Sequence, residues 1–214
     1  MTVRIGTSGW QYRDWRGTFY PPSVAQARWL ETYADGFATV ESNNAFYRLP
    51  ERHVFEAWAE RTPDDFMMAV KMSRFLTHLR RLRDPAEPVQ RFLDRARGLG
   101  RKFGPVLIQL PPQLRADPDR LAATLERFPR DVRVAVEFRH DSWFTDETRT
   151  LLERHGAALC LADRLGVLTP MWRTADWTYL RFHEGRATPR RSARQSAAPW
   201  RSRSVRVSSV NQLR

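Results

Sequence analysis

Short apolar runs recur between Val3 and His183, and stretches with the spacing of an amphipathic helix separate most of them. The runs are rich in valine, leucine and isoleucine and are bounded by turn residues, which is typical of strands buried on both faces of a parallel sheet. The predicted strands are Val3–Thr7, Ala38–Glu41, Phe66–Lys71, Pro105–Leu110, Val132–Val136, Ala157–Ala162 and Trp177–His183. The predicted helices are 23–34, 51–61, 85–99, 118–128 and 145–155. This alternation predicts an α/β fold.

Strands that alternate with helices form either a closed (β/α) barrel or an open doubly wound sheet. An open sheet concentrates its site at one switch point, whereas the loops of a barrel all converge on one mouth. Nearly every predicted strand ends in a polar residue, and no glycine-rich dinucleotide or phosphate-binding loop follows a strand. The pattern therefore favours a TIM-like (β/α) barrel of parallel strands.

The sequence changes abruptly after His183 to a segment rich in arginine, serine and alanine that has no apolar period. A TIM-like barrel has eight strands and about 250 residues, so we expect residues 1–185 to form an incomplete barrel that lacks its last strand and helix. Residues 186–214 are then a basic arm that binds nucleic acid, a solvated disordered tail, or a frame-shifted segment. The abruptness favours the frameshift, and the first and seventh strands would be open, aggregation-prone edges.

The formal net charge of +12 is unevenly distributed. Residues 186–214 contain eight arginines and no acidic residue, which leaves 28 basic and 24 acidic side chains in residues 1–185. Two thirds of the excess charge therefore lies in the tail, which weakens the case for a nucleic-acid partner of the predicted barrel. An anionic small molecule or a nucleic acid is the expected class of partner, and the oligomeric state is left open.

The single cysteine, Cys160, lies within an apolar strand, so an intrachain disulfide is excluded and a structural thiol is expected. The sequence shows neither a secretory signal nor an apolar stretch long enough to cross a bilayer. We therefore expect a cytoplasmic protein with no membrane partner.

Polar side chains at or next to strand ends carry the candidate chemistry. They are Glu41, Lys71, Gln109, Glu137, Asp163 and Arg181. Glu41 and Glu137 would point into the mouth of a barrel, where paired carboxylates act as acid and base, as nucleophile and acid, or as metal ligands. Alternatively, each is neutralised by Lys71, Arg139 or Arg181. Buried charges must be paired, so both interpretations predict the same neighbours.

Lys71 ends an apolar strand, where it would bind an anion or, with a pKa lowered by burial, act as a base or a Schiff-base amine. An ion pair with Glu41 or Glu137 is the simpler interpretation. Arg139 offers a rigid fork for phosphate or carboxylate. Imidazoles near the predicted mouth come from His78, His140 and His183. A divalent metal is a candidate cofactor, although no spacing such as His-Glu-x-x-His occurs.

Aromatic residues crowd the loop after the first predicted strand, namely Trp10, Tyr12, Trp15, Phe19 and Tyr20. They would form either a stacking platform for a base or sugar ring, or a hydrophobic lid that packs over the barrel. We expect a lid in which Trp10 and Tyr12 face the cleft.

Six ordered blocks of the sequence resemble the DUF72, or YecE-like, family of TIM-barrel proteins without an established activity. The blocks are Ile5-Gly6-Thr7-Ser8-Gly9-Trp10 with Tyr12, Trp15 and Phe19-Tyr20-Pro21-Pro22; Glu41 and Asn43 with Phe46-Tyr47-Arg48-Leu49-Pro50; Ala69-Val70-Lys71 with Thr77-His78; Gln109-Leu110-Pro111-Pro112; Glu137-Phe138-Arg139-His140 with Ser142-Trp143; and Leu161-Ala162-Asp163. The resemblance extends to about His183, and Ser42 replaces the family's usual apolar residue. Nothing after Gly185 resembles the family's last part, which ends in a Tyr-Phe-Asn-Asn-like motif.

These observations predict a hydrolase acting on a phosphate-bearing substrate, either a nucleotide or a nucleic acid. The expected catalytic residues are Glu41, Lys71, Glu137 and His183. The expected substrate-binding residues are Trp10, Tyr12, Asn43, Tyr47, His78, Gln109, Arg139, His140, Asp163 and Arg181.

Two alternatives remain. One is a carbohydrate-active hydrolase that uses the paired glutamates across a sugar stacked on Trp10 or Tyr12. The other is a non-catalytic ligand-binding barrel, which unperturbed pKa values in the mouth would favour. A direct salt bridge from each glutamate to Lys71 or Arg139 would favour anion binding or a structural role over sugar hydrolysis.

Overall fold

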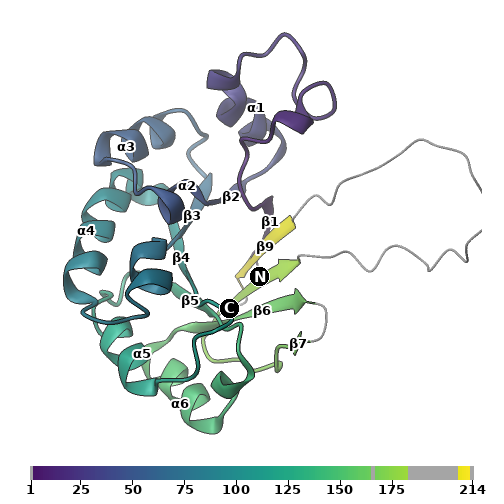
Figure 1. Ribbon diagram of the computed structural model, residues 1–214. Coiled ribbons are helices and arrows are strands. Elements are labelled where there is room, and N and C mark those ends of the chain that lie inside the picture. Colours follow the sequence, from purple (N-terminus) through teal and green to yellow (C-terminus); the bar gives the residue numbers. More distant parts are fainter. Residues whose placement is uncertain (1, 165–166, 183–206, 213–214) are drawn as a thin grey trace, which may run out of the picture.

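A computed structural model describes residues 2–164, 167–182 and 207–212 of the chain (Figure 1). The strands are β1 (Thr2–Thr7), β2 (Thr39–Ser42), β3 (Met67–Lys71), β4 (Phe103–Gln109), β5 (Val134–Glu137), β6 (Ala158–Arg164), β7 (Val167–Leu168), β8 (Thr178–Phe182) and β9 (Val207–Gln212). The α-helices are α1 (Trp29–Gly36), α2 (Asn44–Tyr47), α3 (Arg52–Glu60), α4 (Ala86–Ala96), α5 (Pro118–Leu125) and α6 (Asp146–His155). Shorter 3-10 or π turns are η1 (Arg13–Trp15), η2 (Gln26–Arg28), η3 (Phe75–Leu79), η4 (Arg97–Lys102) and η5 (Asp141–Trp143).

The strands form one curled sheet in the order β1-β9-β8-β6-β5-β4-β3-β2, with β7 paired to β6. Pairing is parallel from β2 through β6 and between β6 and β8. Helices α3 to α6 lie along the outer side of the curl (Figure 1). The predicted α/β class and the mainly parallel sheet are confirmed. None of the described helices has the length and apolar character to cross a membrane.

The prediction that the chain lacks a strand after residue 186 was wrong. Residues 207–212 form β9, which pairs antiparallel with both β1 and β8 and lies between them. The search for apolar runs missed β9 because its sequence, VSSVNQ, contains only two apolar residues. The first and seventh predicted strands are therefore not open edges. The rest of the predicted tail and His183 lie outside the described residues, and the frameshift interpretation stays a prediction.

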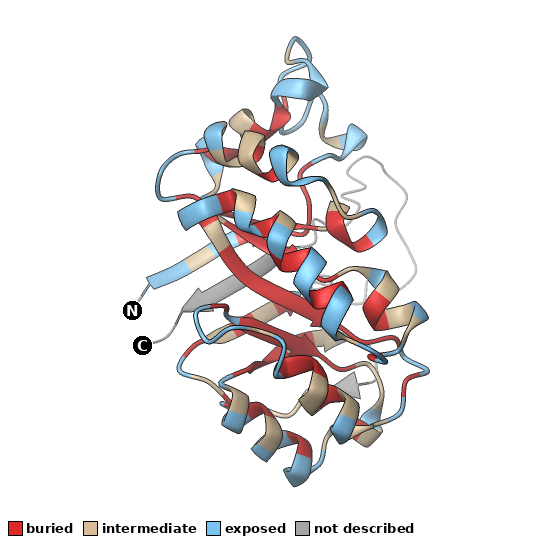
Figure 2. Cartoon of the chain, turned by 90° about the vertical axis from the view of Figure 1, so that its left-hand side faces the viewer, coloured by how far each residue is buried: buried red, intermediate tan, exposed pale blue. Residues whose placement is uncertain are grey.

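Alternate residues of each strand point to opposite faces of the sheet. The outward rows of β3, β4 and β5 pack beneath the helices in the main core, and Figure 2 shows these strands as a buried centre. The inward rows form a second cluster of mostly small side chains: Ala69, Leu107, Ala135, Ala158 and Cys160, with Trp177 and Tyr179. Two residues further along, the same inward rows reach Lys71, Gln109, Glu137 and Arg181. The strand period therefore places these polar groups together at one end of the sheet.

Strands β1 and β2 approach each other closely at Gly6. A Cβ atom on Gly6 would lie 2.0 Å from the carbonyl oxygen of Thr39. Beside this contact, the hydroxyl of Tyr33 accepts a hydrogen bond from the Thr7 N–H at 2.8 Å and donates one to Thr39 O at 3.0 Å. A parallel bridge between Ser8 and Glu41 follows. Glycine is required at position 6 because any side chain would separate the two strands.

Replacing Gly6→Ala should reduce the free energy of unfolding by about 1–3 kcal/mol or more, the usual cost of inserting a methyl group into a packed site. The matched control is Gly36→Ala in α1, where the new Cβ would only reach ordinary contact with Phe19 at 3.6 Å. Alanine favours helix, so this control should be neutral or stabilising. Urea unfolding of the two variants checks the difference, and equal stabilities would contradict the close approach.

Candidate functional site

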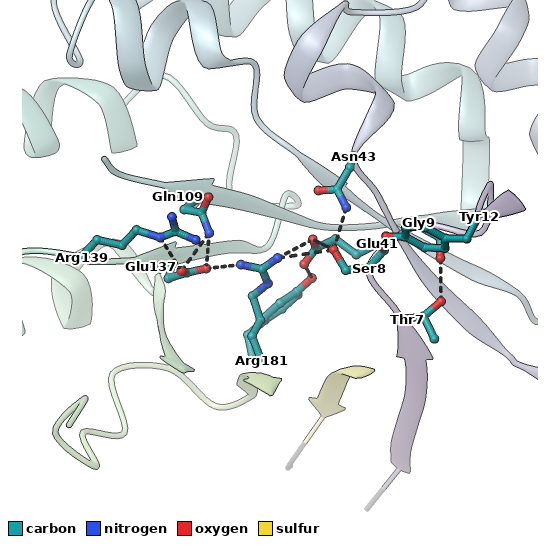
Figure 3. Close-up of polar contacts among 11 residues, drawn as sticks. Thr7, Ser8, Gly9, Tyr12, Glu41, Asn43, Gln109, Glu137, Arg139 and Arg181 are labelled. Carbon is teal, nitrogen blue, oxygen red and sulfur yellow. Dashed lines mark hydrogen bonds and ion pairs between the residues drawn. The ribbon is translucent and has the colours of Figure 1, made fainter. Parts of the chain in front are cut away.

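The guanidinium of Arg181, on β8, connects two buried carboxylates from distant parts of the sheet (Figure 3). Its Nη2 lies 3.0 Å from Glu41 Oε1, and its Nη1 donates to Glu137 Oε2. The side chain of Arg181 is 4% exposed and those of both glutamates are 0% exposed. A planar guanidinium suits this arrangement because its donors are fixed in a fork. Strands β2, β5 and β8 are thereby tied together at their carboxyl ends.

Additional donors surround Glu137. Gln109 Nε2 lies 2.8 Å from each carboxylate oxygen, and Arg139 Nε donates to Oε1 at 3.0 Å. Burial by itself would raise the pKa of Glu137, but the charges of Arg181 and Arg139 and these hydrogen bonds lower it to about 2. Glu137 is therefore ionised at neutral pH and is a poor proton acceptor there.

Glu41 is held by hydroxyl groups as well as by Arg181. Ser8 Oγ donates to Glu41 Oε1 at 2.9 Å, and the Tyr179 hydroxyl donates to Oε2 at 2.9 Å. Asn43 Nδ2 in turn donates to Ser8 Oγ at 2.6 Å. Burial and the charge of Glu41 raise the pKa of Tyr179 well above its usual value, so the phenol keeps its proton. Both oxygens of Glu41 are thus committed to protein donors.

Lys71 ends β3 and is 8% exposed. Its ammonium lies 4.1 Å from the centre of the Phe46 ring, a cation–π contact. In the described part of the chain, Nζ makes neither an ion pair nor a hydrogen bond, which differs from the predicted pair with Glu41 or Glu137. Burial lowers the pKa of Lys71 to about 8, although the nearby charge of Glu41 partly offsets this effect.

A cleft of 1010 Å³ opens above these groups. Three cationic side chains of the cluster line it, namely Lys71, Arg139 and Arg181, whereas neither buried glutamate does. Its polar and aromatic walls include Ser8, Gln11, Asn43, Asn44, Trp10, Tyr12, Trp15, Tyr47 and Trp58, and its other charged or titratable residues are Asp14, Arg48, Glu51 and His53. The formal charges of Glu41, Glu137, Lys71, Arg139 and Arg181 sum to +1, so the floor of the cleft presents an excess of positive charge.

The structure brings most of the predicted site residues to this cleft. The residues that line it are Trp10, Tyr12, Asn43, Tyr47, Lys71, Arg139 and Arg181. Glu41, Gln109 and Glu137 lie directly beneath. Trp10 is almost fully buried and packs edge-on against Trp58, with ring centres 5.2 Å apart, which fits the predicted lid.

Three other predicted residues do not line the cleft. His140 accepts a hydrogen bond from the Ser142 N–H at 3.1 Å and caps η5. Asp163 is out of phase with Cys160 on β6, so strand alternation places it on the outward face. His78 lies behind Phe46, where burial and the charge of Lys71 lower its pKa to about 4. His183 lies outside the described residues.

Sequence reasoning missed Ser8 and Tyr179 as members of the cluster. Both were detectable by position, since Tyr179 precedes Arg181 by two residues on the inward row and Ser8 directly follows β1. Neither stood out in the sequence, because Tyr179 lies inside an apolar run and Ser8 lies among small residues.

No group of three histidine, cysteine, aspartate or glutamate side chains in the described part of the chain is placed to hold a metal ion. The two glutamates of the cluster are bridged by Arg181, whose donors occupy the directions from which a cation would approach. The structure therefore supplies no donor set for the predicted divalent metal among these residues.

The model of a family described as "Protein of unknown function DUF72" matches residues 4–213, beyond the point near His183 where the resemblance was expected to end. The UPF0759 protein YunF of Bacillus subtilis (strain 168) is 26% identical over 199 residues, covering 85% of this chain and 70% of YunF. The crystal structure of a DUF72 family protein (TM1631) from Thermotoga maritima MSB8 is 32% identical with a TM-score of 0.73, covering 83% of this chain and 73% of that one. A DUF72 family protein (EF0366) from Enterococcus faecalis V583 is 18% identical with a TM-score of 0.71, covering 89% and 74%, and shows the fold alone.

Replacing Arg181→Met should reduce the free energy of unfolding by about 3–5 kcal/mol, because two buried carboxylates lose their shared partner. The control is Arg149→Met, which removes only the exposed ion pair with Glu153 and should cost less than about 1 kcal/mol. Chemical denaturation at pH 7 measures both. A loss for Arg181→Met no greater than that of the control would contradict the bridging role.

The pKa of Glu137 also predicts how stability depends on pH. A carboxylate whose folded pKa is about 2 stabilises the fold above its ordinary pKa near 4.5 and loses that contribution as pH falls toward 2. We expect the free energy of unfolding of Glu137→Gln to fall less steeply than that of the unsubstituted protein over this interval. Glu153→Gln, at an exposed position, should keep the original slope. Parallel curves for all three proteins would refute this assignment.

Proposed function

Because the chain belongs to the DUF72 family, whose function is unknown, we propose a function from the cleft itself: it binds a phosphate-bearing anion between Lys71, Arg139 and Arg181. The observation that carries this proposal is where the charged groups lie relative to the open cleft. The two carboxylates are buried and saturated with donors, while the three cations line the open cleft. The excess positive charge at the partly buried floor of the cleft favours an anionic ligand.

Arg139 is the best placed of the three cations to contact a ligand directly. Its side chain is 21% exposed, and its Nε is the atom that bonds Glu137. Its two Nη groups have no partner among the described residues, so they remain available as a fork for phosphate oxygens. Lys71 adds a point charge on the same floor.

Aromatic side chains on the cleft wall support a ligand that also carries a ring. Tyr47 is 74% exposed, and Tyr12 is partly exposed on the same cleft. Exposed rings provide stacking surfaces for a base. A nucleotide combines such a base with phosphate, so it is a ligand type that these aromatic and cationic side chains would fit.

The glutamates support binding rather than hydrolysis. Each forms a direct salt bridge with Arg181, and their oxygens already accept hydrogen bonds from the protein. A pair of carboxylates that flank a sugar must instead reach the substrate. The geometry therefore favours anion binding over a carbohydrate hydrolase, and hydrolysis of a phosphoester stays a prediction.

We also propose that the curled sheet is a TIM-like barrel with this cleft at its mouth. The parallel strands end at the cleft, as in barrels whose sites form at the carboxyl ends of the strands. Supporting observations are the position of β9 between β8 and β1 and the bridge from Ser8 to Glu41, which brings β2 back to β1.

Calorimetric titration with inorganic phosphate, pyrophosphate and ATP tests the binding proposal. Arg139→Gln should weaken binding about tenfold or more, since a hydrogen bond to a charged group contributes about 1.5–3 kcal/mol. It should also reduce the salt dependence of binding. Arg149→Gln, on α6 and not among the residues that line the cleft, should bind like the unsubstituted protein. Absence of binding by all three probes, or unchanged affinity in Arg139→Gln, would overturn the proposal.

A further inference from the structure

The chain has two lysines, Lys71 and Lys102, and both are buried in contrasting surroundings. Lys102 Nζ donates hydrogen bonds to the carbonyl oxygens of Ala59 and Thr62. Lys71 Nζ has no hydrogen-bond or ion-pair partner among the described residues, although it lines the cleft. A buried amine needs a reason to remain unpaired, because burial of an unsatisfied charged group is costly.

A nucleophilic lysine needs an accessible amine that loses its proton near neutral pH, and proteins meet this need by desolvation and neighbouring cations. Both conditions occur at Lys71. Phe46 covers one side of the ammonium, and Arg181 and Arg139 oppose its charge. Glu41 and Glu137 act in the opposite direction, yet the pKa still falls to about 8.

We propose that Lys71 is the nucleophile of a Schiff-base reaction with a phosphate-bearing aldehyde or ketone bound in the cleft. This inference rests on the proposed anion site, because Arg139 would hold the phosphate while the carbonyl carbon faces Nζ. The Nζ lone pair forms the new C–N bond, and the two amine protons leave with the carbonyl oxygen as water. The products are an imine and one water molecule, and no oxidant or reductant is required.

The surroundings of Lys71 distinguish a nucleophilic amine from a lysine that only contributes a positive charge. A lysine that only bound phosphate would function equally well with its ordinary pKa and with exposure to solvent. Burial beneath the cleft instead removes water from the amine and favours its neutral form, although the Phe46 ring by itself favours the ammonium. The substitution Lys71→Arg therefore keeps a positive charge in the cleft but removes the ability to form an imine.

The test uses the full chain with pyridoxal 5′-phosphate as the probe, since it combines an aldehyde, a phosphate and an aromatic ring. Reduction with cyanoborohydride fixes any imine, and mass spectrometry of the digest locates it. We expect Lys71 to be labelled at least tenfold more than Lys102, which is the internal control, and we expect inorganic phosphate to slow the labelling. Pyridoxal, which lacks the phosphate, should label Lys71 at least tenfold more slowly.

Two measurements separate failure of this inference from failure of the anion site. Lys71→Arg should lose the imine absorbance, and the unsubstituted protein should bind inorganic phosphate in calorimetry. If phosphate binds and depends on Arg139 but Lys71 is not labelled, the Schiff-base inference is wrong and the anion site stands. If pyridoxal labels Lys71 as fast as its phosphate does, phosphate recognition is absent and the inference as stated is overturned.

Discussion

One guanidinium neutralises two carboxylates in the interior of the sheet, and the arrangement of the cluster depends on that contact. Ionised side chains are stable away from water only when they are paired and hydrogen-bonded. Arg181 meets this condition for Glu41 and Glu137 together, which come from β2, the last strand in the sheet order, and from β5. The curl brings the ends of these strands within reach of one side chain. The ion pairs in turn fix where Arg139, Ser8 and Tyr179 can lie.

Much of this arrangement could be predicted from the alternation of residues along strands. Small residues fill the inward rows, and the next inward position is polar on several strands, so Lys71, Gln109 and Glu137 were expected to meet. Asp163 looked equivalent because it also ends a strand, but it is one residue out of phase. His140 stands close to Glu137 in sequence, yet the chain turns there and the imidazole is used as a helix cap. The alternation of side chains along a strand and the capping of a helical turn therefore decide whether these two residues reach the cleft.

Two features that the sequence did not predict, β9 and the absence of an ion pair at Lys71 among the described residues, have a different physical origin. β9 contains only two apolar residues, and its backbone pairs with β1 and β8 on both sides. Backbone pairing leaves little trace in an apolar pattern. The lack of an ion pair at Lys71 was equally hard to foresee, since two glutamates were available. Glu41 is already engaged by an arginine and two hydroxyl groups, and Glu137 by two arginines and an amide, so competition among donors decided the outcome. Such competition is a property of three-dimensional neighbours and cannot be read from spacing.

Burial has opposite consequences for the two kinds of group at this site, and the difference determines what each can do. Glu137 is desolvated but surrounded by cations and amide donors, so it stays ionised and loses its value as a base. Lys71 is desolvated beside an aromatic ring with cations nearby, so its neutral form becomes accessible. The residues that most resembled a catalytic pair in sequence therefore act as the framework. The group that resembled an ion-pair partner is the one left chemically available at the surface of the cleft.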